Sequence, residues 1–147
     1  MSFGLIFFLV QLTFSVVTYL AAFVKGGSAE RVGAAIILGN LIAGMANEAF
    51  LHDQMVTLAI DGITAVALLP VTLRYVSFWL GAVMILYALQ FALHAYYVVM
   101  ELHRDVVHVV LNNVDFFAIN LCLALGVGLA WSRRRRALAA EAARPAA

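Results

Sequence analysis

The sequence has little charge, little proline and almost no cysteine. Only 12% of its 147 residues are charged, and it contains two prolines and one cysteine, Cys122. A single cysteine excludes an intramolecular disulfide, so cysteine usage gives no information about the redox compartment. The scarcity of charge is typical of a chain that lies largely in hydrocarbon, and no nucleic-acid partner is expected.

Long apolar runs fill the chain instead, and 65% of its residues are hydrophobic. A helix needs about 20 consecutive apolar residues to cross a hydrocarbon layer of roughly 30 Å. Five segments come close to this length. The sequence therefore predicts an all-α transmembrane bundle that is embedded in a lipid bilayer, with spans at residues 3–24, 32–50, 55–73, 77–100 and 106–131.

The break between the third and fourth segments is the weakest boundary, and four spans are the alternative. Only Pro70, Thr72, Arg74 and Ser77 interrupt the apolar stretch 55–100. That stretch is too long for one helix, and a proline together with a charge near its middle is where a turn is expected.

The lysines and arginines predict how the chain is oriented. Lys25, Arg31, Arg74 and residues 133–136 share one side if there are five spans, and Arg104 opposes them. Because basic residues in short loops stay in the cytoplasm, the amino terminus is predicted outside and the carboxyl terminus inside. Residues 1–136 are the predicted transmembrane domain, and residues 137–147 a cytoplasmic alanine-rich tail.

Two further features concern the ends of the spans. No basic residue precedes Lys25, which counts against a cleaved signal peptide. Trp79 and Trp131 lie near the predicted inner boundary, and Tyr96 and Tyr97 near the outer one. This distribution is typical of an aromatic belt.

Polar residues gather in the predicted outer half of the bundle. An ionisable group in hydrocarbon is costly, so these side chains should face the interior or a wet cavity. Helical spacing places them on shared faces, as with Gln90, His94 and Tyr97. The candidate cluster consists of Glu48, His52, Asp61, His94, His108, Asn112 and Asp115. Asn40 and Asn47 share a glycine-containing face that is most simply a packing surface.

Three interpretations of this cluster compete. It can be a hydrogen-bonded network that fixes helix register, a metal or haem site, or a site that translocates a proton or small cation with Asp61 or Glu48 as the carrier. Histidine and carboxylate suit zinc, iron or copper, but their spacing matches no established ligand motif. Translocation by so few spans would require a homo-oligomer.

The segments Leu73-Arg74 and Phe78-Trp79-Leu80-Gly81, followed by Gln90 and His94, resemble an uncharacterised family of small multi-spanning bacterial inner-membrane proteins. The resemblance implies a bacterial plasma membrane and no particular function.

The sequence contains no catalytic constellation, and its hydrophilic loops are too short to bind a soluble substrate by themselves. We therefore expect a non-enzymatic accessory or assembly component of a membrane complex, in contact with other subunits or with copies of itself. The alternative is a small transporter or a metal- or haem-binding membrane protein that uses the outer-half cluster.

Overall fold

The chain forms a helical bundle, as predicted. The computed structural model describes the backbone of residues 3–143 and the side chains of residues 9–143, and this part of the chain contains no strand. The π-helical turn η1 (Asn47–Leu51) extends the second helix without a break. The α-helices are α1 (Phe3–Lys25), α2 (Ser28–Ala46), α3 (Gln54–Tyr75), α4 (Phe78–Val99) and α5 (Val106–Ala142).

Four stretches of the described chain are long and apolar enough to cross a membrane: α2 with η1, α3, α4 and α5. The segment Leu9–Lys25 of α1 is a shorter apolar helix. The protein is therefore a multi-pass membrane protein with four or five spans. Most large exposed side chains are aliphatic or aromatic, as a surface in contact with lipid requires.

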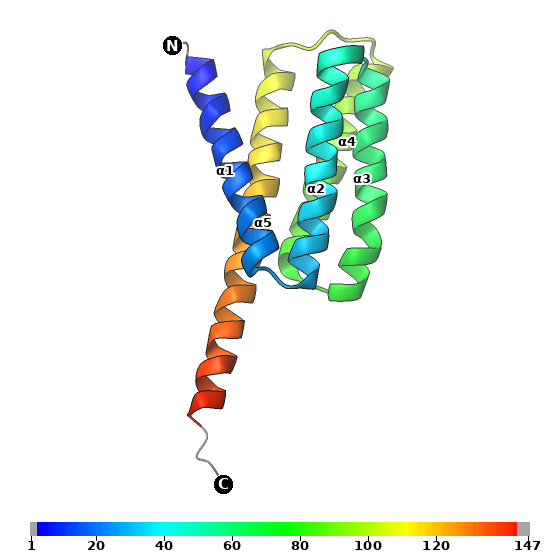
Figure 1. Ribbon diagram of the computed structural model, residues 1–147. Coiled ribbons are helices and arrows are strands. Elements are labelled where there is room, and N and C mark those ends of the chain that lie inside the picture. Colours follow the sequence, from blue (N-terminus) through cyan, green and yellow to red (C-terminus); the bar gives the residue numbers. More distant parts are fainter. Residues whose placement is uncertain (1–2, 144–147) are drawn as a thin grey trace.

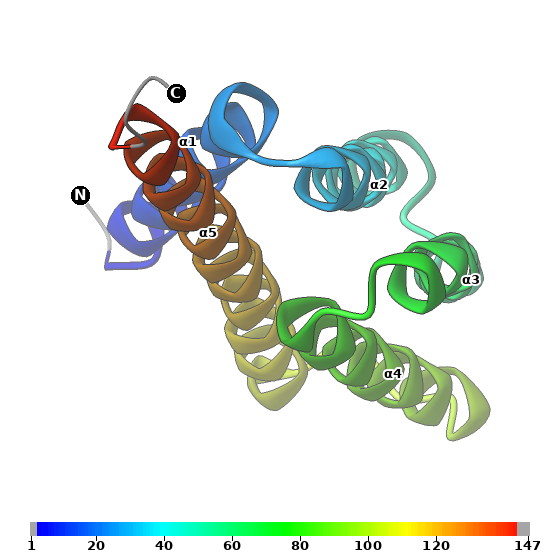
Figure 2. The ribbon, with the colours of Figure 1, turned by 90° about the horizontal axis from the view of Figure 1, so that it is seen from below.

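Consecutive helices run in opposite directions and pack side by side (Figure 1). Seen along the bundle, α2, α3, α4 and α5 follow one another in an arc, and α1 lies against α5 (Figure 2). The rings of Phe14 and Phe117 join α1 to α5, with centroids 5.3 Å apart. Toward its amino-terminal end, α1 leans away from α2 in both views.

Local chemistry explains where the helices begin and end. The turn between α1 and α2 begins at Gly26. A larger residue does not fit there, because a Cβ would lie 2.3 Å from the Ala22 carbonyl oxygen. Asp53 and Asp105 cap the starts of α3 and α5 by accepting backbone N–H groups. The chain turns at Val76, where φ is 36°.

The predicted break between the third and fourth spans is therefore confirmed, but Pro70 does not form it. Pro70 lies inside α3, and the helix continues to Tyr75. A proline within a helix removes one backbone hydrogen bond, and α3 tolerates this loss in its last two turns.

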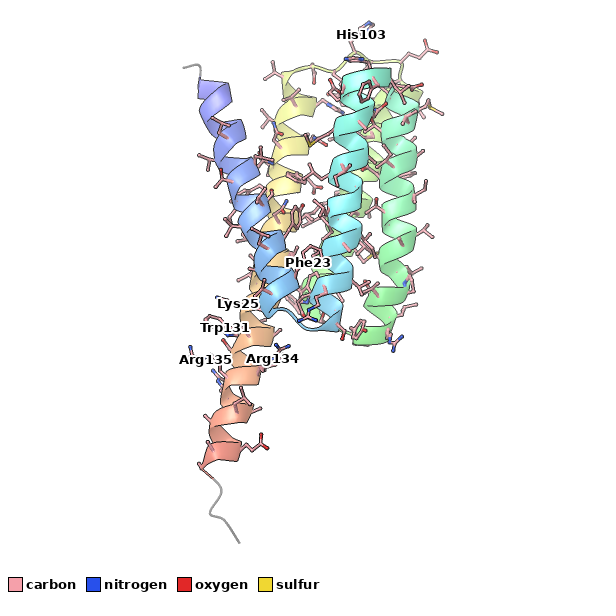
Figure 3. All side chains as sticks on the ribbon, viewed as in Figure 1. Phe23, Lys25, His103, Trp131, Arg134 and Arg135 are labelled. Atoms are coloured by element: carbon pink, nitrogen blue, oxygen red, sulfur yellow. The ribbon has the colours of Figure 1, made fainter. Side chains whose placement is uncertain are left out.

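Trp79 does not belong to an aromatic belt. It is 5% exposed, and its indole lies between Gly33 of α2 and Gly126 of α5. Its Nε1 donates to Glu30 Oε1 at 3.2 Å. Trp131 does lie at the surface, 40% exposed, with the cations of Lys25 and Arg135 over its ring (Figure 3).

The two ends of the bundle differ in charge, which permits a test of orientation. His103 lies at one end and Lys25, Arg134 and Arg135 at the other (Figure 3). In a variant without Cys122, we expect a cysteine at Ser28 to be protected from an impermeant thiol reagent in intact cells, and a cysteine at His103 to react. Both positions are exposed, so the reverse pattern would mean that the orientation is inverted.

Candidate functional site

The centre of the site is a buried ion pair between α3 and α4. Asp61 is 2% exposed and His94 is 5% exposed. His94 Nδ1 lies 2.5 Å from Asp61 Oδ2. Since an isolated charge in hydrocarbon costs about 2.5 to 3.5 kcal/mol even on a lenient scale, a partner for Asp61 is a strong requirement. The histidine meets that requirement.

Amides from two other positions complete the coordination of the carboxylate. Asn40 of α2 donates to Asp61 Oδ1 at 3.1 Å and to Thr64 Oγ1 at 3.0 Å. Gln90 Nε2 lies 3.4 Å from the same Asp61 oxygen. Gln90 and His94 are one helical turn apart on α4, so both reach toward α3. Two helices, α2 and α4, thus place side chains on one carboxyl group of α3.

A chain of aromatic and polar contacts leads from His94 to the predicted outer surface. The rings of His94 and His108 lie 5.1 Å apart, and those of His108 and Tyr97 lie 4.5 Å apart. The Tyr97 hydroxyl donates to Asp105 Oδ1 at 2.6 Å. That bond and the His108 backbone N–H lower the pKa of Asp105 below its ordinary value. Asp105 is therefore a stable acceptor that orients Tyr97 against His108.

A second ion pair lies at the predicted outer rim. Arg104 donates to Glu48 Oε2 at 2.7 Å and to Thr57 Oγ1 at 3.1 Å. Both side chains are partly or largely in contact with the surroundings, with Glu48 62% exposed. Solvent weakens such a pair. Glu48 is consequently held by an arginine at the surface, whereas Asp61 is held by a histidine in the interior.

These groups surround a cavity of about 370 Å³ in the predicted outer half of the bundle. All five α-helices or the segments next to them contribute to its walls. Leu12, Leu41, Met45, Ile60 and Phe116 form apolar parts of the lining. The polar residues that line it are Gln11, Asn40, Glu48, Thr57, Asp61, Gln90, His94, Arg104, His108, Asn112 and Asn113.

The structure brings together five of the seven residues predicted for the cluster. Glu48, Asp61, His94, His108 and Asn112 line the cavity, and Asn112 Oδ1 accepts from Gln90 at 3.5 Å.

The other two predicted residues lie elsewhere. His52 does not join Glu48 on a helical face, because the π-helical turn ends at His52 in a left-handed conformation and leaves its side chain exposed. Asp115 is not part of the lining. It lies one turn beyond Asn112 on α5 and has one buried oxygen.

Sequence reasoning misses two residues that hold the carboxylates of the site, Asn40 and Arg104. It predicts a packing surface for Asn40, although the spacing of seven residues between Asn40 and Asn47 places both on the side of α2 and η1 that faces α3. Arg104 was used only for orientation. The signal for Arg104 was its position between Glu101 and Asp105, which does not reveal that it reaches Glu48.

The arrangement suits proton exchange better than metal binding. A carboxyl group and an imidazole in one short hydrogen bond can share a proton. Within residues 9–143, no group of three or more histidine, cysteine, aspartate or glutamate side chains is arranged to hold a metal ion. The metal or haem interpretation therefore gains no geometric support from the described residues.

Comparison of the chain with protein-family models, with curated proteins and with solved structures gives no match.

Proposed function

We propose that this chain is a small multi-pass protein of the bacterial inner membrane that binds and releases a proton or small cation at Asp61, as part of transport. The observation that carries the proposal is a buried carboxylate, paired with His94, on the wall of a cavity. Carboxylates at such depth are typical of ion and proton pathways. The proposed orientation, with the amino terminus outside, makes the cavity accessible from the periplasmic half of the membrane.

The two candidate carriers differ in environment, and this difference favours Asp61. Glu48 is largely exposed and already neutralised by Arg104. Because Arg104 already balances the charge of Glu48, this carboxylate has little attraction for a further cation. Asp61 is buried, and its neighbours other than His94 are the neutral groups of Asn40 and Gln90. Gain or loss of a proton there changes the charge of the interior.

A pure packing network is also consistent with the bonds of Asp61, so the experiment must separate the two. We expect Asp61→Asn to fold, because asparagine keeps the shape and most of the hydrogen bonds. It removes the titrating group, however. In infrared difference spectra recorded across a pH step, the wild type should show a buried carboxyl band that Asp61→Asn lacks.

The control for this measurement is Glu101→Gln, which removes an exposed carboxylate from the loop after α4. This variant should keep the buried carboxyl band. If a folded Asp61→Asn protein gives the same band as the wild type, Asp61 does not exchange a proton and the packing interpretation stands.

An accessory or assembly role is the second candidate, and one face of α2 supports it. A Cβ added at Gly39 would meet no atom within 4 Å. Small residues on an open face let a second transmembrane helix approach closely. We expect Gly39→Leu to remove higher-mass species from native mass spectra in mild detergent. Gly128→Leu, at another open glycine on α5, is the matched control, and equal spectra for both variants would argue against contact through α2.

A further inference from the structure

A set of unpaired polar atoms continues inward from the cavity. Apart from Ser77 at the turn before α4, every buried side-chain nitrogen or oxygen without a hydrogen-bond partner in the described residues belongs to this set. The atoms come from three helices that surround one region of the interior. They are Gln90 Oε1, Tyr87 Oη, Asp115 Oδ2, Asn120 Oδ1 and Tyr19 Oη.

These residues follow one another along the helices and form a column. On α4, Gln90 lies one turn inward from His94, and Tyr87 lies almost one turn further. Helix α5 runs in the opposite direction, so Asp115 and then Asn120 follow Asn112 inward. Tyr87 lies within electrostatic range of Asp61, Asp115 and Tyr19, and Tyr19 neighbours the side chain of Asn120.

Four of the five residues in this column are buried, and Asp115 has one buried oxygen, which makes the lack of protein partners informative. Tyr87 and Asn120 are 0% exposed, and Tyr19 is 4% exposed. An unpaired hydroxyl or amide in an apolar interior costs several kcal/mol, and proteins meet this cost by holding ordered water at such groups. Several polar atoms around one region provide the two to four partners that each such water requires.

We propose that this column is a hydrated proton path that leads inward from the Asp61 and His94 pair to the level of Tyr19 and Asn120. It rests on the proposed function and specifies the transported species as a proton. In the transfer step, the proton that Asp61 and His94 share passes to the water chain and leaves an Asp61 carboxylate beside a neutral His94 imidazole. The Asp115 carboxylate takes up a proton from the same chain and becomes a neutral carboxyl group. No other reactant is required.

The column ends at an apolar layer on its inner side. Ala22, Leu80 and Leu123 lie beyond Tyr19 and Asn120, and each is 0% exposed. This apolar layer is part of the packed core. Hydroxyl groups and water pass a proton by exchanging hydrogen bonds, whereas a hydrated cation needs an open passage. The apolar layer is therefore the barrier that separates the path from the predicted inner surface.

The test measures proton flux into liposomes that contain the full chain and a trapped pH indicator, under a potassium diffusion potential. Leu80→Ser places a hydroxyl in the apolar layer and should raise the flux. Leu123→Ser is a second variant of the same layer in case Leu80→Ser does not fold. In either background, adding Tyr87→Phe or Asp115→Asn should lower the flux about tenfold or more, because each removes a group that carries the proton.

Two matched controls and one ion substitution make the result decisive. Leu89→Ser and Tyr96→Phe alter exposed residues of α4 and should leave the flux at the wild-type value. Replacing external sodium by choline should not change it. The inference is overturned if neither serine variant raises the flux, if Tyr87→Phe and Asp115→Asn leave the raised flux unchanged, or if the flux requires sodium.

Failure of the path and failure of the proposed function give different results. If the buried carboxyl band of Asp61 is present but the flux does not depend on Tyr87 and Asp115, the cavity binds a proton and the column does not conduct it. If the Asp61 band is absent, the proposed function itself fails. Circular dichroism and gel filtration of each variant exclude loss of folding as the cause.

Discussion

His94→Leu is expected to lower the free energy of unfolding by about 3 to 5 kcal/mol, because it leaves the Asp61 carboxylate buried without a charged partner. The carboxylate lies 2.5 Å from His94 Nδ1, and both side chains are buried. Asn40 and Gln90 would still donate to it, but two neutral amides do not balance a charge in hydrocarbon. Reversible unfolding in mixed micelles would measure the change.

The double variant His94→Leu with Asp61→Leu separates loss of the pair from loss of packing. Replacing a buried ion pair by apolar residues of similar volume is often neutral for stability. We therefore expect the double variant to recover most of the free energy of unfolding that His94→Leu loses. A single variant as stable as the wild type would show that Asp61 carries no charge that His94 must balance.

Trp79→Ala is expected to lower the free energy of unfolding by about 3 to 5 kcal/mol, which is the range for removing a large aromatic side chain from a packed core. The indole fills the space between Gly33 and Gly126, so its loss leaves a cavity between α2 and α5. It also removes the donor to the buried carboxylate of Glu30. Thermal unfolding in detergent would measure the effect.

The glycines on both sides of Trp79 allow a complementary experiment. A Cβ at Gly126 would lie 2.7 Å from Trp79 Cδ1, so Gly126→Ala should cost about 1 to 3 kcal/mol through overpacking. Gly128→Ala is the matched control, because a Cβ there meets nothing within 4 Å. Equal stability of the two alanine variants would contradict the packing that the structure shows around Trp79.

For much of the site, the sequence predicts which face of each helix carries the polar residues. The period of 3.6 residues places Gln90, His94 and Tyr97 on one side of α4, and all three are buried. The cost of burying a charge predicts that Asp61 faces the interior, where the structure places it. This reasoning says that a polar group needs a partner, but it does not say which residue of another helix supplies it.

His52 and Trp79 show where that reasoning fails. A regular helix would bring His52 beside Glu48, but η1 and the left-handed residue at its end turn His52 away. Trp79 lies near a span end, where tryptophan usually meets the interface. Two glycines on other helices instead leave a slot that receives its ring.

Three properties can be predicted from the order of residues alone: the helical membrane bundle, the breaks between its spans and the polar face of each helix. These properties follow from apolar length and from a period that each helix carries alone. The partners of the polar groups cannot be predicted in this way. The packed structure is needed to show that Asp61 meets His94 and Asn40, that Glu48 meets Arg104, and that α1, α4 and α5 all carry unpaired groups. This is because the rotation and offset of each helix depend on how side chains of several helices pack together at once.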